Sequence, residues 1–334
     1  MASLDLAKAL NLPGLPLFLK QLNQRLAGVA ETAGLGLKTP LLGAVNAKSK
    51  RLRPALLLAS TIGSQPRQTT LSGATAIELL HIGSLVHDDI IDNPAVRWGR
   101  PTISSQNQAT ALLVGDYLLA QANAQAADIS AEAARLISTA TSGLIQGVAQ
   151  ENADQFKLTR SIDSYISCVG LKTGSLIAAA CQLGGNCADL ELSQSQALRT
   201  YGMNLGISFQ IIDDLLDILS TAQLLGKPTG QDAANGTYSL PVLISLRGSS
   251  RTKLITTLAS SSRPKALANL LIEDNSITQS ISYANKYNQL GVDALSAFAP
   301  EEVSELAELP EIYLNWALNN LVAKQYQSKL NKNH

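Results

Sequence analysis

The sequence predicts an all-α protein. Its 334 residues are 46% hydrophobic but only 4% aromatic, and this composition offers few of the β-branched and aromatic runs that strands favour. Apolar residues recur at every third or fourth position, and clusters of Gly, Pro, Asn and Ser separate these runs. This spacing predicts helices, whereas the alternation typical of half-buried strands is nearly absent.

Taken in order along the chain, the periodic runs predict helices at 15–33, 39–62, 69–93, 105–123, 131–157, 161–185, 192–219, 238–247, 262–271, 275–298 and 302–331. The two least helical stretches are 221–239 and 247–264, and the second is Ser-rich, so we expect a mobile surface loop there. No repeat and no low-complexity linker divides the chain. We therefore expect a single all-α domain over residues 1–334.

Charge and cysteine content limit the possible partners and compartment. The formal net charge is +0, so no overall field favours nucleic acid or an acidic membrane surface. The three cysteines, Cys168, Cys181 and Cys187, form no CxxC pair, which is typical of a reduced chain. No apolar run reaches the roughly 18 residues of a membrane span. We expect a soluble, cytoplasmic protein that binds no nucleic acid.

Acidic residues gather at the end of the apolar run 69–93. Residues three and four apart share one face of a helix, so His81, Ser84, Asp88 and Asp92 form one polar stripe, with Asp89 beside it. Burying any of these carboxylates is expensive unless a cation is present.

A second acidic set lies in the run 192–219. Gln210, Asp213 and Asp217 share a helical face, and Asp214 is adjacent. One DDxxD pattern alone is more often a solvated helix end, but two such sets flanked by Ile, Leu and Val favour a site for a hard cation such as Mg²⁺. A glycosidase-like acid pair is the alternative for two carboxyls, yet it leaves the neighbouring arginines unexplained.

Basic side chains are available to bind an anion beside these acids. They occur in four short segments and are Lys50, Arg51 and Arg53; Arg97 and Arg100; Lys172, with Thr173 next to it; and Lys227. Arg and Lys bind diphosphate groups by charge-assisted bonds. Neither a Walker loop nor a GxGxxG turn occurs, so nucleotide binding is not indicated.

These segments, in this order, resemble the all-trans polyprenyl diphosphate synthases. The resemblance covers about 46–246 and rests on KRLRP, LLHIGSLVHDDIIDN, VGDYLLAQA, LKTGSL, FQIIDDLLDI, GKPTGQD and LP. It implies a helical bundle around a central cavity, with an apolar tunnel that shields an allylic cation from water.

The resemblance also implies a role for each site residue. Three Mg²⁺ ions are expected, two on Asp88 and Asp92 and a third on Asp213, with Asp89 in support. Asp214 and Asp217 would hold water or lie behind the direct ligands. Arg97, Lys172, Thr173, Gln210 and Lys227 would bind an allylic diphosphate, and Lys50, Arg53 and His81 would bind isopentenyl diphosphate. The metal draws off the allylic diphosphate, the isopentenyl double bond attacks the cation, and the departing diphosphate takes the proton.

Two positions depart from the family pattern. The family usually has two adjacent arginines after the first acidic set, and Trp98 stands in place of the second, which normally contacts isopentenyl diphosphate. Thr237 replaces a frequent lysine. Arg100, two residues after Trp98, is the candidate to compensate, because a long guanidinium arm can reach a nearby phosphate.

Product length is expected to depend on the turn before the first acidic set. Gly83 and Ser84 lie about one turn before Asp88, and in the resembling family small residues there let a growing chain pass. We therefore predict a product longer than twenty carbons. By contrast, Gly115 and Asp116 are expected to fix helix contacts.

Two other functions compete with chain elongation. A terpene synthase of the same fold would ionise an allylic diphosphate without adding an isopentenyl unit. A non-catalytic subunit of a hetero-oligomer is the third possibility, although two intact acidic sets in apolar helices oppose it. For the enzyme we expect a homodimer whose product is passed to a membrane enzyme.

Overall fold

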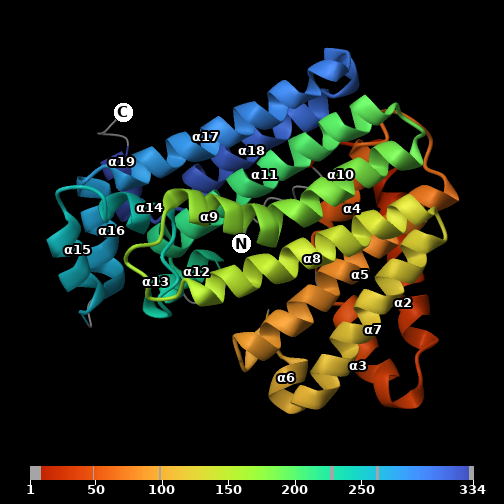
Figure 1. Ribbon diagram of the computed structural model, residues 1–334, viewed down its shortest axis with the longest axis horizontal. Helices are drawn as coiled ribbons and strands as arrows, with labels where there is room; N and C mark the ends of the chain where they lie inside the picture. Colours follow the sequence, from red (N-terminus) through yellow and green to blue (C-terminus); the bar gives the residue numbers. More distant parts are fainter. Residues whose placement is uncertain (1–8, 48, 98, 226–228, 261–262, 331–334) are drawn as a thin grey trace.

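The computed structural model describes residues 9–47, 49–97, 99–225, 229–260 and 263–330, and these residues are almost entirely helical (Figure 1). The α-helices are α2 (Leu15–Glu31), α3 (Leu35–Val45), α4 (Leu52–Ala59), α5 (Gln68–Ile91), α6 (Ile103–Gln106), α7 (Gln108–Ala127), α8 (Ala131–Ala153), α9 (Ile162–Val169), α10 (Ser175–Cys187), α11 (Leu192–Leu219), α12 (Ala222–Leu225), α13 (Gln231–Ala234), α14 (Leu240–Ser245), α15 (Arg251–Leu258), α16 (Arg263–Glu273), α17 (Ser276–Ala294), α18 (Ser304–Asn320) and α19 (Lys324–Leu330). A π-helical turn, η1 (Gly170–Gly174), joins α9 to α10, and two 3₁₀ turns, η2 (Leu295–Ala297) and η3 (Pro300–Glu302), precede α18. The strands found in these ranges are β1 (Val96–Arg97) and β2 (Arg100–Pro101), which pair antiparallel. The predicted all-α class is confirmed.

The long predicted helices are confirmed, but some are interrupted. The predicted helix 39–62 is two helices, α3 and α4, because Arg51 adopts a left-handed conformation at φ 50° and ends the continuity. The predicted helix 161–185 contains the π-turn η1, and the predicted helix 302–331 divides into α18 and α19.

The prediction of a surface loop at 247–264 is wrong, because the helix α15 lies within this stretch and α16 begins at its end. Leu254 and Leu258 lie one turn apart on α15 and are both buried. These two leucines form an apolar face that is difficult to recognise in a sequence of mostly polar residues. The stretch 221–239 likewise contains the short helices α12 and α13.

Several helices begin at a residue whose side chain caps the first turn. Thr102, Asn107, Ser130 and Ser161 each accept a hydrogen bond from the backbone amide three residues later, at 2.8–3.1 Å. Such caps satisfy amides that have no partner within the helix.

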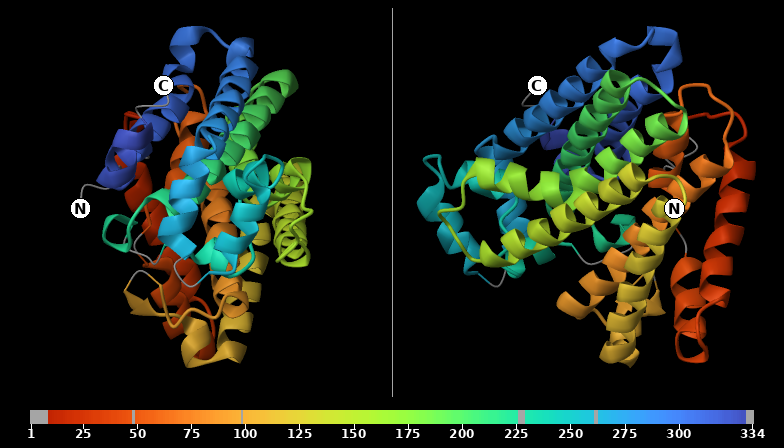
Figure 2. Two further views of the ribbon diagram at one scale, coloured as in Figure 1. Left: turned by 90° about the vertical axis from the view of Figure 1, so that its left-hand side faces the viewer. Right: turned by 45° about the vertical axis from the view of Figure 1, so that its right-hand side comes forward.

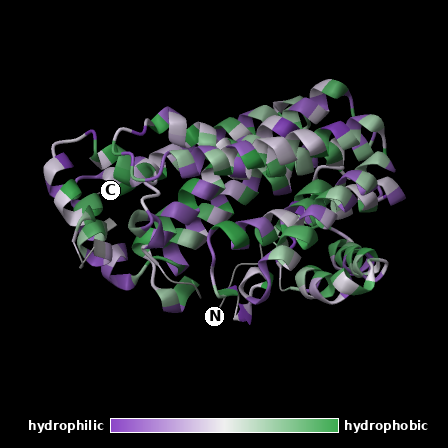
Figure 3. Cartoon of the chain, turned by 60° about the horizontal axis from the view of Figure 1, so that its bottom comes forward, coloured by the Kyte–Doolittle hydropathy of each residue, from purple (hydrophilic) through white to green (hydrophobic). Residues whose placement is uncertain are grey.

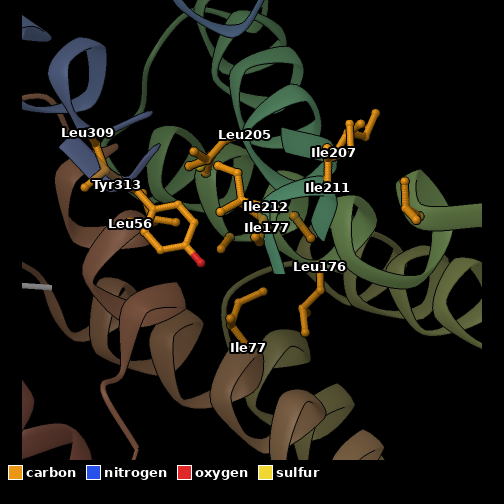
Figure 4. Packing of buried hydrophobic residues seen from close by; sticks show 14 of the residues in the cluster. Leu56, Ile77, Leu176, Ile177, Leu205, Ile207, Ile211, Ile212, Leu309 and Tyr313 are labelled. Atoms are coloured by element: carbon orange, nitrogen blue, oxygen red, sulfur yellow. The ribbon is translucent and has the colours of Figure 1, made fainter. Parts of the chain in front are cut away.

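The centre of the fold is the packing of α10 on α11, with α5 below them and α17 above (Figures 1 and 2). Ile177 of α10 and Leu205 and Ile212 of α11 lie close together in this core (Figure 4). The two backbones approach closely, because a Cβ on Gly202 would lie 2.8 Å from the Ile177 carbonyl oxygen. Because glycine has no side chain, the two helices pack at short distance, and this brings the faces that carry the site residues together.

The second contact that sets the site is the packing of α5 on α7. A Cβ on Gly115 would lie 2.1 Å from Nε2 of His87, so only glycine leaves room for this ring. The same imidazole nitrogen lies 3.4 Å from a carboxylate oxygen of Asp116. The prediction that Gly115 and Asp116 fix helix contacts is therefore confirmed.

Apolar and polar residues share most helices, as the hydropathy colouring shows (Figure 3). The continuous run Ile162–Cys187 is long and apolar enough to cross a membrane by composition alone, but 67% of its apolar window is buried inside the protein. That burial is the behaviour of a core helix.

Candidate active site

The two acidic sets lie on the two long central helices α5 and α11. Asp88 and Asp89 occupy the last turn of α5, and Asp92 caps its C-terminus. Asp213, Asp214 and Asp217 lie near the end of α11. Burial differs within each set: Asp89, Asp214 and Asp217 are buried, Asp88 and Asp213 are half-buried, and Asp92 is exposed.

Electrostatic contacts show that the sets face one space. Glu151 of α8 interacts both with Asp88 of α5 and with Asp214 of α11, so all three carboxylates surround the same region. Burial and neighbouring Asp92 raise the pKa of Asp88, whereas Lys172 and Arg97 act in the opposite direction. Crowded acids with raised pKa values are typical of sites that take a cation.

The Asp88 carboxylate is available to such a cation. No hydrogen bond and no ion pair within 4 Å reaches it from the residues that the structure describes. A half-buried carboxylate without such partners has oxygen atoms free for a metal ion, and hard oxygen ligands suit Mg²⁺. In the described ranges, however, no three His, Cys, Asp or Glu side chains lie close enough together to form a complete metal site on their own.

Asp214 is held by side chains and not exposed to a ligand. The Tyr165 hydroxyl donates to one carboxylate oxygen at 2.6 Å, and the Gln210 amide donates to the other at 2.8 Å. Burial raises the pKa of Asp214 to about 7, against the effect of these two donors. Thr173 extends the network, because its hydroxyl donates to Gln210 at 2.8 Å.

Asp217 anchors the loop that follows α11. Its carboxylate accepts hydrogen bonds from the backbone amides of Gly230 at 3.1 Å and Asp232 at 3.4 Å. Lys227, expected to bind the allylic diphosphate, precedes these amides in the chain and lies outside the described residues. The position of Asp217 fits a supporting role, because its oxygens already have donors.

Asp89 organises the hairpin after α5. Nε of Arg97 donates to the Asp89 carboxylate at 2.6 Å, and the Ser104 hydroxyl donates to the Asp89 backbone carbonyl at 2.8 Å. Gly99 makes the turn with a φ of 77°. Arg100 follows on β2 and is exposed, whereas the unusual residue at position 98, Trp98, lies outside the described residues.

A cavity of about 570 Å³ opens beside this hairpin, between α3, α5 and α6. His81, Asp89, Arg97 and Arg100 all line it, together with apolar residues of α3 and α5. The structure thus brings four of the predicted site residues to one opening.

Two of the groups predicted to bind a second diphosphate, Arg53 of α4 and His81 of α5, lie against each other. Arg53 lies 3.0 Å from Nε2 of His81, and Nε of Arg53 is buried without a hydrogen-bond partner in the described part of the chain. Burial first, then the Arg53 charge, hold the pKa of His81 well below its usual range, so the neutral imidazole accepts the bond. Lys50 is exposed and lies over the Trp316 ring, 5.9 Å from its centroid.

Arg51 has a different role from its two basic neighbours. It is buried and forms an ion pair with buried Glu78 at 2.6 Å, and it also donates to the Val45 carbonyl oxygen at 2.7 Å. These bonds fix the α3–α4 connection, so Arg51 is a structural residue.

Lys172 lies on the π-turn η1, where its ammonium pairs with Glu151. π-helical turns are rare and frequently mark functional sites. Close backbone contacts hold this turn: a Cβ on Gly147 would lie 2.5 Å from the Lys172 amide nitrogen, and a Cβ on Gly206 would lie 2.5 Å from Cα of Gly174. Helices α8 and α11 therefore fix Lys172 from two sides.

The residues predicted to control product length lie on the buried part of α5. A Cβ on Gly83 would lie 3.2 Å from Leu118 and 3.3 Å from the Gly115 carbonyl oxygen, so Gly83 is also needed for the α5–α7 packing. Ser84 is buried, and its hydroxyl donates to the His81 carbonyl at 2.8 Å. Their role in chain length stays a prediction.

Two residues of the site were missed in the sequence, Glu151 and Tyr165. Their partners lie 21 and 49 residues away, so no local spacing connects them. One signal was present for Glu151, since it is the first charge after the uncharged run 136–150.

An all-α fold with paired acidic sets defines a class of protein, and the comparisons with known proteins agree. The Polyprenyl synthetase family model matches residues 36–272. The chain therefore belongs to the polyprenyl synthetase family.

Individual relatives are similar over most of the chain. Nonaprenyl diphosphate synthase of Mycobacterium tuberculosis is 35% identical over 289 residues, which is 84% of each chain. Heptaprenyl diphosphate synthase component 2 of Geobacillus stearothermophilus is 36% identical over 60% of this chain and 64% of its own. The crystal structure of heptaprenyl diphosphate synthase from Staphylococcus aureus matches with a TM-score of 0.79 at 28% identity, covering 89% of this chain and 98% of that one.

A decaprenyl diphosphate synthase from Rhodobacter capsulatus matches with a TM-score of 0.82 at 24% identity, over 91% of this chain and 97% of that one. This last likeness concerns the fold alone.

Proposed function

We propose that this protein is a trans-prenyltransferase that condenses an allylic diphosphate with isopentenyl diphosphate into a polyprenyl diphosphate longer than twenty carbons. The carrying observation is that two acidic sets face one space, because Glu151 interacts with Asp88 on one side and Asp214 on the other. Family membership and similarity to nonaprenyl and heptaprenyl diphosphate synthases support the same activity.

We propose three Mg²⁺ ions for this site, two held by Asp88 and Asp92 and one by Asp213. When bound, they supply Lewis-acid stabilisation of the leaving diphosphate. Mg²⁺ commonly binds through one or two carboxylates together with waters and substrate phosphates, so three separated carboxylates are suitable ligands. Asp214 and Asp217, whose oxygens accept hydrogen bonds from the protein, support Asp213 and the loop after α11.

The chain's own cations bind the allylic diphosphate. Lys172 and Arg97 interact electrostatically with Asp88, so a diphosphate beside Asp88 meets two positive charges. Thr173 and Gln210 lie on the same network, and Lys227 belongs to the same proposal. Charge-assisted bonds from these groups strengthen as negative charge develops on the departing diphosphate.

The second diphosphate is bound by Lys50, Arg53 and His81. The buried Nε of Arg53, which lacks a partner in the described residues, is available for an anion once the neutral His81 fixes the guanidinium from the side. Arg100 lines the cavity that also contains His81 and takes over the contact that an arginine at position 98 would make. The allylic cation is attacked by the isopentenyl double bond, and the proton passes to the departing diphosphate.

The two competing functions are not favoured. A terpene synthase needs no isopentenyl site, yet the Arg53–His81 pair is built beside the acidic set. A non-catalytic subunit has no need of a half-buried Asp88 whose carboxylate has no partner among the described residues, because such burial destabilises the protein.

A homodimer is proposed from the exposed faces of α7 and α8. Leu113 on α7 is 56% exposed and Ile145 on α8 is 57% exposed; Leu113 lies in the uncharged stretch 101–115 and Ile145 in the uncharged stretch 136–150. Two neighbouring helices that expose apolar residues from such stretches can bury each other's apolar surface across a twofold axis. Cytoplasmic location and transfer of the product to a membrane enzyme remain part of the proposal.

Product sizing tests the proposed activity. The protein is incubated with Mg²⁺, farnesyl or geranylgeranyl diphosphate and labelled isopentenyl diphosphate, and the extracted products are separated by chain length. Labelled products longer than twenty carbons are expected. Consumption of the allylic diphosphate without incorporation of label would instead establish a terpene synthase.

A further inference from the structure

Glu151 interacts electrostatically with both acidic sets and has no assigned role in the reaction. It lies near the end of α8, with its side chain 22% exposed, and it pairs with Lys172, whose side chain is 33% exposed. Glu151 therefore lies inside the site and not on the outer surface.

The position of this pair is fixed by backbone contacts. Gly147 lies one turn before Glu151 on α8, and a Cβ there would lie 2.9 Å from both Cα and Cβ of Lys172. The π-turn η1 directs Lys172 toward α8 from the other side. Helix α8 thus carries both the surface against which Lys172 packs and the carboxylate that binds its ammonium.

Other carboxylates compete for the same ammonium. After Glu151, the charges that act most on Lys172 are those of Asp88 and Asp92. A lysine side chain is flexible and has three donors, so an ammonium released from Glu151 would move to these two aspartates. There it would occupy the oxygens that a cation needs.

We propose that Glu151 is a positioning residue that holds Lys172 away from Asp88 and Asp92. These carboxylates then stay open to a divalent cation, and the Lys172 ammonium stays available to bind the diphosphate. This inference rests on the proposed function, because it assigns the cation to Asp88 and Asp92. It gives Glu151 no contact with the metal ion itself.

Mn²⁺ binding to the substrate-free protein, titrated by electron paramagnetic resonance, tests the proposal without any turnover. The variants are Glu151→Ala, Lys172→Ala and the double variant. Glu151→Ala is expected to weaken Mn²⁺ binding by about tenfold or more, within the range of coupling between charged neighbours. Adding Lys172→Ala to it should restore most of the loss, because the competing ammonium is gone.

Two further variants separate positioning from other causes. Glu151→Gln keeps an oxygen that accepts from Lys172, so it should bind Mn²⁺ more tightly than Glu151→Ala. Glu132→Gln removes one negative charge from the exposed start of the same helix and should leave Mn²⁺ binding unchanged. Thermal unfolding of each variant confirms that the fold is retained.

The cycle has distinct outcomes. If Lys172→Ala strengthens Mn²⁺ binding by the same factor in the wild type and in Glu151→Ala, the two charges act independently and the holding role is wrong. If the double variant stays as weak as Glu151→Ala, Glu151 itself is a metal ligand and the proposal is overturned. A substrate-free wild type that binds no Mn²⁺ overturns this inference; the metal sites of the proposed function are contradicted only if added inorganic diphosphate also fails to produce Mn²⁺ binding.

Discussion

At the scale of single residues, the site depends on which charges have partners. Asp89 and Asp214 each accept two hydrogen bonds from the protein, through side chain or backbone, and Asp217 accepts from loop amides. The Asp88 carboxylate accepts no hydrogen bond from the described residues. The two DDxxD patterns look equivalent in sequence, but the protein hydrogen-bonds their members differently, as the proposed division into ligands and supports requires.

His81 gives a prediction for stability against pH. Burial beside Arg53 keeps its pKa well below 6.5 in the folded protein, whereas in the unfolded chain it titrates near 6.5. Below pH 6.5 the unfolded state therefore binds the extra proton, and the free energy of unfolding falls by up to roughly 1.4 kcal/mol per pH unit from this residue. The stability that neutral His81 provides is fully present at pH values above the pKa of His81 in the unfolded chain.

Urea unfolding at pH 7.5 and pH 5.5 measures this effect. The His81→Gln variant should lose less stability between the two pH values than the wild type, because glutamine does not titrate. His87→Gln is the control, since His87 pairs with Asp116 and lies apart from Arg53. Equal losses in wild type and His81→Gln would contradict the neutral imidazole.

The sequence predicts these residues to different degrees. Asp88, Asp92 and His81 share a face by helical spacing, so their stripe could be read directly. Tyr165 and Glu151 could not, because their contacts form only when α9 and α8 pack beside α11 and α5. Contacts between distant segments depend on packing that single-sequence patterns do not contain.

At the scale of elements, apolar periodicity predicts where helices form, but it does not predict where a helix is interrupted. The apolar periodicity over 161–185 is continuous, yet η1 lies within this stretch. Gly147 and Gly206 of the neighbouring helices contact the turn closely. The loop predicted at 247–264 failed for the opposite reason, because Leu254 and Leu258 supply just enough apolar face for α15. Tertiary packing decides both cases.

The π-turn supports a prediction at Gly147. In Gly147→Ala the new methyl would lie 2.5 Å from the Lys172 amide nitrogen, and overpacking of this kind costs about 1–3 kcal/mol. The free energy of unfolding should fall by that amount, and kcat should fall as Lys172 is displaced. Gly143→Ala is the control one turn earlier, where the nearest atom is 3.4 Å away; if both variants behave alike, the close contact does not position Lys172.

Helix α5 supports a prediction for product length. Ser84→Phe should shorten the products, since a large ring one turn before Asp88 would block a growing chain on that face. Leu85→Phe is the control, because Leu85 lines the cavity on the α3 side. Chromatography of the labelled products decides, and shortening by Leu85→Phe alone would show that the chain grows on the other side of α5.

At the scale of the whole molecule, the fold places the acidic ends of α5 and α11 so that both interact with Glu151. The run Ile162–Cys187 is mostly buried, and α7 and α8 expose Leu113 and Ile145. Family membership covers residues 36–272, and a single domain over 1–334 stays a prediction.

The exposed apolar residues of α7 and α8, Leu113 and Ile145, predict a dimer that one charge can disrupt. Ile145→Asp should shift the protein to a monomer, because burying an unpaired carboxylate at an interface is unfavourable. Size-exclusion chromatography with light scattering measures the mass. Leu192→Asp is the matched control, since Leu192 is similarly exposed at 62% but lies on α11; a dimer that survives Ile145→Asp would place the interface elsewhere.

The central claim is that both acidic sets act in one metal-dependent elongation site. Its most direct test is Mg²⁺-dependent incorporation of labelled isopentenyl diphosphate by the wild type, Asp88→Asn and Asp213→Asn. The wild type should make products beyond twenty carbons, and each variant should lose more than about 100-fold in kcat/KM, since even supporting residues of metal sites contribute 10–100-fold. Folding of both variants is checked by circular dichroism. Near-normal incorporation by either folded variant in the presence of Mg²⁺ would contradict the account.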